Sequence, residues 1–147
     1  MCKILVADSN AEIWDIMRDV FSEAWGGTVR CVASGREAAE VIVTSPVDLL
    51  ITSVILPEIS GFRLAEIAAR NKIPVLLMSG DLEAQNMLEQ VGLVYLQKPF
   101  RLLELRRLAG AAICNPHYNA QQTLNCLKAL KMPGQMRFQA GIMAEAA

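Results

Sequence analysis

The chain has 147 residues, of which 53% are hydrophobic, and its net charge at neutral pH is −1. Its length is that of one domain, and its apolar content is sufficient for one hydrophobic core. A charge this close to zero gives no reason to expect nucleic acid as a partner, and no apolar run reaches the ~20 residues that a membrane-spanning helix requires. We therefore expect neither nucleic-acid nor membrane binding.

The first third of the chain alternates short apolar segments with amphipathic ones. Residues 2–7 form an apolar run that predicts a buried strand. In the segment 13–25, apolar residues recur at helical spacing with charged residues on the other side, which predicts an amphipathic helix. The β-branched and apolar segment 28–33 predicts a second strand, and a second helix is expected at 34–44.

The same alternation continues to about residue 113. It predicts further strands and helices, in chain order, at 49–54, 62–71, 73–78, 82–91, 93–96 and 100–113. Five strands that alternate with five helices predict an α/β domain of the flavodoxin-like (βα)5 type. We expect a doubly wound, five-stranded parallel sheet with the strand order 2-1-3-4-5 and right-handed crossovers.

The pattern changes after residue 114. Residues 115–119 are expected to form a loop, and 120–131 predict one more helix with leucines on one side. Residues 135–147 show no regular pattern. We therefore expect one domain at 1–114 and a helical tail at 115–147 that is too short for a separate output domain.

Cysteine and histidine usage argues against a zinc site or a disulfide framework. The four cysteines have no close pair spacing, and His117 is the only histidine. We expect reduced thiols and, because the chain becomes acidic at Asp8 without a signal peptide, a cytoplasmic location.

The predicted topology brings five polar residues together. In an open α/β sheet, ligands bind at the carboxyl ends of the strands, next to the point where the strand order reverses. Asp8 and Ser9 follow the first strand, Ser53 the third, Ser79 the fourth and Lys98 the fifth. These side chains are therefore expected to surround one crevice.

Four segments around these positions resemble the receiver domains of bacterial response regulators, which belong to two-component phosphorelay systems. The resemblance covers residues 2–112 and rests on the segments 3–9, 53–61, 74–80 and 95–100. Its most specific part is the sequence Lys98-Pro99-Phe100 after the fifth strand. The resemblance implies that the bond between Lys98 and Pro99 is cis.

The resemblance also implies roles for four matching residues. In such domains, acids after the first and third strands bind magnesium, and an aspartate after the third strand accepts a phosphoryl group. Asp8 matches the first acid, and Ser79 and Lys98 match the residues that contact the phosphoryl group. Tyr95 matches the aromatic residue that turns inward in the phosphorylated state.

Two positions depart from the family pattern. Ser9 replaces the second acid, and Ser53 replaces the phosphoacceptor aspartate, four residues before the loop proline. The crevice thus loses about two negative charges, so we expect no cofactor and at most weak magnesium binding at Asp8. Glu58 and Asp81 lie on adjacent loops and are the acids that could replace the missing ones.

The remaining acid and the lysine predict a neutral crevice. We expect a salt bridge between Asp8 and Lys98, with the hydroxyls of Ser9, Ser53 and Ser79 completing a hydrogen-bond network. Such a network would hold one conformation without phosphate.

The leading functional hypothesis is a stand-alone, phosphorylation-independent receiver that is not an enzyme and has no catalytic residue. Its partner would be a sensor histidine kinase or another signalling protein. A homodimer through the segments 82–91, 93–96 and 100–113 is a further alternative. Two alternatives remain: a conventional phosphorelay receiver modified at Asp8 or another unusual residue, and a small-ligand module that uses the crevice. A serine hydrolase is not expected, because no base or Gly-x-Ser-x-Gly motif accompanies Ser53.

Overall fold

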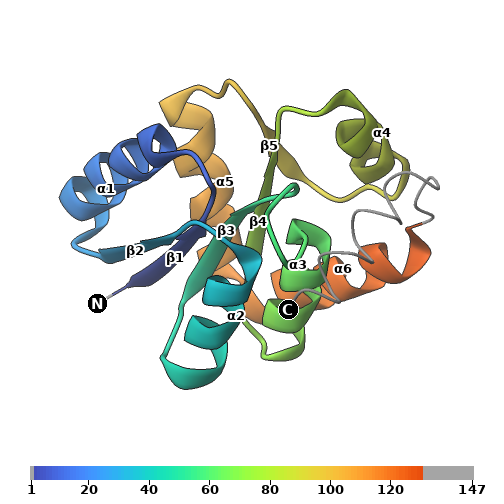
Figure 1. The fold of residues 1–147 in the computed structure, drawn as a ribbon, viewed down its shortest axis with the longest axis horizontal. Coiled ribbons are helices and arrows are strands. Elements are labelled where there is room, and N and C mark those ends of the chain that lie inside the picture. The colour runs from blue at the N-terminus through green and yellow to red at the C-terminus, as the bar shows by residue number, and fades with distance from the viewer. Residues whose placement is uncertain (1, 131–147) are drawn as a thin grey trace.

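The computed structural model describes residues 2–130. Its five strands form one parallel sheet in the order β2-β1-β3-β4-β5, as predicted (Figure 1). The strands are β1 (Lys3–Ala7), β2 (Thr28–Val32), β3 (Leu49–Ser53), β4 (Val75–Ser79) and β5 (Tyr95–Gln97). The helices are α1 (Ala11–Trp25), α2 (Gly35–Thr44), α3 (Gly61–Arg70), α4 (Leu82–Gln90), α5 (Leu102–Cys114) and α6 (Pro116–Ala129).

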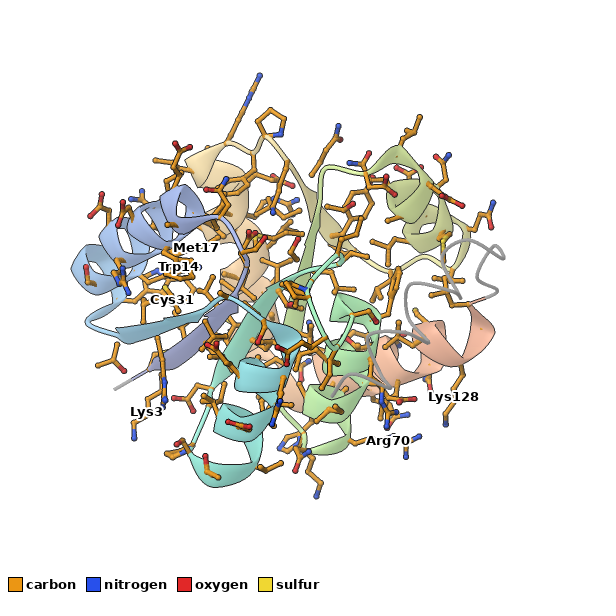
Figure 2. All side chains as sticks on the ribbon, viewed as in Figure 1. Lys3, Trp14, Met17, Cys31, Arg70 and Lys128 are labelled. Carbon is orange, nitrogen blue, oxygen red and sulfur yellow. The ribbon has the colours of Figure 1, made fainter. Side chains whose placement is uncertain are left out.

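The sheet separates two apolar cores. Alternate residues of each strand face opposite sides, so that Leu5 packs with α2, α3 and α4, whereas Ile4 packs with α1 and α5. Met17 and Cys31 lie between α1 and the sheet, while the charged ends of Lys3, Arg70 and Lys128 extend outward (Figure 2). Both faces of the sheet are therefore covered, as expected for parallel strands.

Side-chain caps define where several helices begin. Asn10 accepts a hydrogen bond from the backbone N–H of Glu12 and caps α1, and Ser34 and Ser60 cap α2 and α3 in the same way. Up to α5, the predicted element boundaries differ from the observed ones by at most two residues. None of the helices within residues 2–130 combines the length and the apolar character needed to cross a bilayer.

The last helix is the largest departure from the prediction. The extra C-terminal helix is confirmed, but the predicted bounds 120–131 and the loop at 115–119 were wrong, because α6 begins at Pro116 and ends at Ala129. Proline suits the first turn of a helix, where its missing N–H has no partner to lose. The side chain of Asn119 accepts a hydrogen bond from the Val75 N–H (2.7 Å) and donates one to the Val75 carbonyl (3.3 Å).

α6 packs mainly against α3 and belongs to the same compact unit (Figure 1). Leu127 and Leu130 contact the core cluster on the α3 side of the sheet. The predictions for residues 131 and 135–147 concern a part of the chain outside the described residues.

Candidate functional site

Asp8 lies at the carboxyl end of β1, and every polar group it has is bonded. The residue is only 2% exposed. One carboxylate oxygen accepts the Asn10 N–H (2.8 Å), and the other accepts the ammonium of Lys98. The Asp8 backbone N–H donates to the Val32 carbonyl (3.1 Å), and its carbonyl accepts the indole N–H of Trp14 (2.8 Å). The carboxylate is thus buried but fully compensated.

Lys98 brings a positive charge from the loop after β5 into the crevice. Its ammonium forms the expected salt bridge with Asp8 and lies 3.3 Å from the Ser53 hydroxyl oxygen. Its backbone N–H donates to the Ser79 carbonyl (2.9 Å), which fixes the start of the loop. The peptide bond to Pro99 is cis. One lysine therefore joins the ends of β1, β3 and β4.

Ser53 is the last residue of β3 and is held in a tightly closed loop. Its side chain is buried, and the Gly61 N–H donates to the carbonyl of Val54 at 2.7 Å. A Cβ atom on Gly61 would lie 2.0 Å from the Ser53 carbonyl oxygen, so only glycine fits there. Ile55, at the rim of the crevice, is exposed.

Ser79 does not join the network that the sequence predicts. Its hydroxyl oxygen accepts the Asp81 N–H (3.1 Å) and the hydroxyl donates to the Asp81 carbonyl (3.2 Å), so it is turned toward its own loop. The Gln85 side chain supports this loop by donating to the Ser79 carbonyl (2.8 Å). Ser9 is exposed and forms none of the hydrogen bonds found among residues 2–130. The prediction of a three-serine network was therefore wrong, because among the serine hydroxyls of residues 2–130 the Lys98 ammonium bonds that of Ser53 alone.

The Ser79 hydroxyl turns toward its own loop because nearby backbone groups compete for its hydrogen bonds. A serine just before a helix satisfies nearby backbone groups at little entropic cost, whereas a bond across the crevice must order side chains from two loops. The Asp81 carboxylate is likewise bonded to nearby backbone, because it caps α4 by accepting the Ala84 N–H (2.9 Å).

Glu58 takes part in none of the hydrogen bonds or salt bridges that Asp8 and Lys98 form among residues 2–130. Its backbone has a φ of 71° in a tight turn that the Ile59 N–H closes on the Pro57 carbonyl (2.9 Å). One of its carboxylate oxygens is buried without a hydrogen-bond partner.

Tyr95 lies on β5 with its hydroxyl bonded to α4. The phenol donates to a carboxylate oxygen of Glu89 (2.7 Å), and its ring packs against the α3-side core. The hydrogen bond to Glu89, and then burial, raises the pKa of Tyr95 above its ordinary value. The hydroxyl is thus bonded to α4.

The donor atoms of the crevice do not fit a magnesium ion. Magnesium requires about six oxygen ligands in octahedral geometry and normally at least one or two free carboxylates. Both oxygens of Asp8 are occupied, and the Ser53 hydroxyl is neutral and beside an ammonium group. No cluster of three or more candidate metal ligands occurs among residues 2–130.

Sequence reasoning did not assign two residues that support the site. Trp14 holds the Asp8 carbonyl, and Gln85 holds the Ser79 carbonyl. Both lie six positions after their partner, on the helix that follows the strand. This strand-to-helix spacing is the signal by which they could have been found.

Comparison with known proteins identifies what the chain is similar to. The family model for the response regulator receiver domain matches residues 4–109. The DNA-binding transcriptional regulator NtrC of Rhizobium meliloti is 34% identical over 118 residues, which are 77% of this chain and 24% of that protein. The regulatory protein VanR of Enterococcus faecium is 33% identical over 110 residues, which are 70% of this chain and 46% of that protein.

The chain thus spans a quarter to a half of the length of these curated relatives. A solved receiver domain of the Francisella response regulator 1452 superposes with a TM-score of 0.62 at 27% identity, covering 84% of this chain and 99% of that domain.

Proposed function

The chain belongs to the response-regulator receiver family of two-component systems, and from this premise we propose that it is an atypical receiver that works without phosphorylation. Receiver domains are in general signalling modules and not enzymes. In this proposal Ser53 occupies the position of the phosphoacceptor aspartate, and the protein signals through contacts with other proteins. Partner binding or protein abundance, and not an aspartyl phosphate, sets its state.

The observation that carries the proposal is the closed contact between Lys98, Asp8 and Ser53. The ammonium is already paired with a buried carboxylate, so it is not free to neutralise an incoming phosphoryl group. The neighbouring Ser53 hydroxyl contacts the amine of Lys98, and that amine is already bonded to Asp8, so no described hydrogen bond links the hydroxyl to a free base. Both features favour one stable conformation over a phosphorylation cycle.

The proposed partner is another signalling protein, such as a sensor histidine kinase. A cytoplasmic location is part of the proposal, because all four cysteines are free, which suits a reducing compartment. A homodimer through α4, β5 and α5 is a further proposal, supported by the exposed apolar side chains of Leu82, Val94 and Leu103 on this surface. Light scattering of wild type and Leu103→Glu tests it, and a monomeric wild type would exclude it.

The decisive experiment exposes the purified protein to acetyl phosphate, with and without magnesium, and reads the intact mass. We expect no phosphoryl adduct and no change in melting temperature with magnesium. The matched variant carries Ser9→Asp and Ser53→Asp together, and it should gain both magnesium binding and a magnesium-dependent adduct.

Two results would contradict the proposal. A magnesium-dependent adduct on the wild type would favour a conventional receiver modified at Asp8 or another residue, which peptide mapping would identify. A double variant that binds no magnesium would show that the three positions do not share the geometry of a receiver site.

A further inference from the structure

A hollow on the α5–α6 side of the molecule lies far from the crevice that holds Ser53. A cavity of about 410 Å³ is lined by α5, α6, the first residues of β4 and the segment before β5. Parallel strands place their amino and carboxyl ends at opposite edges of the sheet, so this cavity is at the edge away from Ser53 and Lys98. Its volume is within the range of about 300–1,000 Å³ typical of small-molecule sites.

The cavity exists because α6 does not pack along α5. Instead α6 lies against α3, beside which it is seen in Figure 1, and Asn119 ties it to the backbone of Val75. The walls opposite are built from small residues, Ala111 and Ala112 on α5 and Gly92 before β5. A Cβ atom on Gly92 would meet nothing within 4 Å. Helix direction and small side chains together leave the space open.

The α6 side chains that line the cavity fall into two adjacent stripes of the helix. Tyr118, Gln122 and Cys126 recur at intervals of four residues, which places them along one stripe of the helix. Leu127 and Leu130 contact the core on the α3 side. Asn119 and Thr123, in the adjacent stripe, line the cavity as well and attach α6 to the domain, since Asn119 bonds the Val75 backbone and Thr123 is buried.

The lining combines an apolar body with polar groups at its edge. Leu93, Val94 and Leu108 form the apolar part of the wall. The side chains at the cavity remain accessible to solvent, since Val94 is 63% exposed and Tyr118 is 61% exposed. Gln122 supplies an amide. Apolar walls with a few polar groups are the usual composition of a ligand site.

The lining carries one cationic side chain among the described residues, and a carboxylate outside the lining pairs with it. Arg107 is the only charged residue among the described residues that line the cavity. Its Nε and Nη2 atoms bond the carboxylate of Glu104 at 3.1 and 2.7 Å, whereas Nη1 takes part in no hydrogen bond found within residues 2–130. A guanidinium can serve two partners on different edges, so Arg107 can meet an anion without releasing Glu104.

We propose that this cavity is a binding site for a small amphipathic anion, with a planar apolar body beside Tyr118 and Leu108 and a carboxylate or sulfonate bonded to Arg107. The site goes beyond the proposed signalling function and does not depend on whether Ser53 is phosphorylated. Its walls include the first residues of β4 and the segment before β5, the two strands that end at Ser79 and before Lys98.

The test uses 8-anilinonaphthalene-1-sulfonate, an aromatic sulfonate whose fluorescence rises in apolar sites. Titration of the native protein is expected to give one saturable site. Ala111→Phe fills the cavity from an exposed helix position and should weaken binding by at least about tenfold. Arg107→Gln removes the charge and should weaken binding by about threefold to fivefold, the effect of one exposed ion pair.

Arg106→Gln is the matched control, because Arg106 is exposed on the same helix but does not line the cavity, and its affinity should equal that of the wild type. The neutral probe N-phenyl-1-naphthylamine should bind wild type and Arg107→Gln equally. Circular dichroism and melting temperature verify that each variant is folded.

Three results would overturn the proposal: no saturable binding, wild-type affinity in a folded Ala111→Phe variant, or equal affinities of the sulfonate for Arg107→Gln and Arg106→Gln.

Discussion

Lys98 and Asp8 are 90 positions apart in the chain, yet the ammonium of one contacts the carboxylate of the other. The two residues follow β5 and β1, and the ends of β3 and β4 lie between these strands in the sheet. Asp8 is almost completely buried, whereas the side chain of Lys98 is 23% exposed. The pair is therefore asymmetric, and its two members should respond differently to substitution.

Lys98→Met is expected to be the more damaging change. It leaves the buried Asp8 carboxylate without a counter-ion, which should lower the free energy of unfolding by about 3 kcal/mol. Asp8→Asn should cost less, because the partly exposed ammonium of Lys98 can then turn toward water. Urea unfolding at neutral pH measures both variants and the double variant, which should lose less stability than the sum of the two. Additive losses would mean that the two charges are not coupled.

Gly61→Ala is expected to disturb the loop that holds Ser53. Its new Cβ would lie 2.0 Å from the Ser53 carbonyl oxygen, so the backbone must shift, at a cost of about 3 kcal/mol. Gly110→Ala is the control, because the nearest atom to its Cβ is a Trp25 ring carbon at 3.9 Å. This second variant should be more stable than wild type by about 0.5–1 kcal/mol, the helix preference of alanine over glycine. Equal effects in thermal unfolding would contradict the predicted contact.

Asn119→Ala tests whether α6 is part of the domain. The substitution leaves the Val75 N–H without its side-chain partner, which should cost about 1–3 kcal/mol. Asn125→Ala, on the same helix, removes only an exposed bond from Gln121 and should change stability by less than about 0.5 kcal/mol. Hydrogen exchange of the Val75 amide should accelerate in the first variant only. An unchanged exchange rate would mean that this contact does not protect β4.

The Tyr95–Glu89 hydrogen bond predicts a stability change at high pH. The hydrogen bond and burial raise the pKa of Tyr95 above the ordinary 10.0, because they favour the neutral phenol. The raised pKa therefore contributes stability that is present below pH 10 and is lost as the pH rises through the folded-state pKa.

Glu89→Gln removes the charged acceptor and should let the Tyr95 phenol titrate at a lower pH than in wild type. The ultraviolet absorbance of the phenolate, compared between the two proteins and Tyr95→Phe, measures this difference. Coincident titration curves would show that the bond is absent in solution.

The order of elements was predictable because each one depends on near neighbours in the chain. Apolar alternation and helical periodicity predicted the elements and most boundaries within two residues, and the flavodoxin-like fold type then predicted the sheet order. Alternation also placed Asp8, Ser53 and Lys98 at the same edge of the sheet, which was enough to predict their contact. The start of α6 was missed because Asn115-Pro116 was interpreted as a loop, although proline also suits the first turn of a helix.

The amino-acid sequence alone therefore determined the α/β topology, the position of the crevice and the residue types within it. Only the tertiary structure decided that Ser79 turns toward Asp81, that Ser9 stays in solvent and that α6 leaves a cavity beside α5. The physical reason is that periodicity reports which face of an element is buried, whereas the direction of a hydroxyl or the crossing of a helix depends on competing partners that only the folded chain brings together.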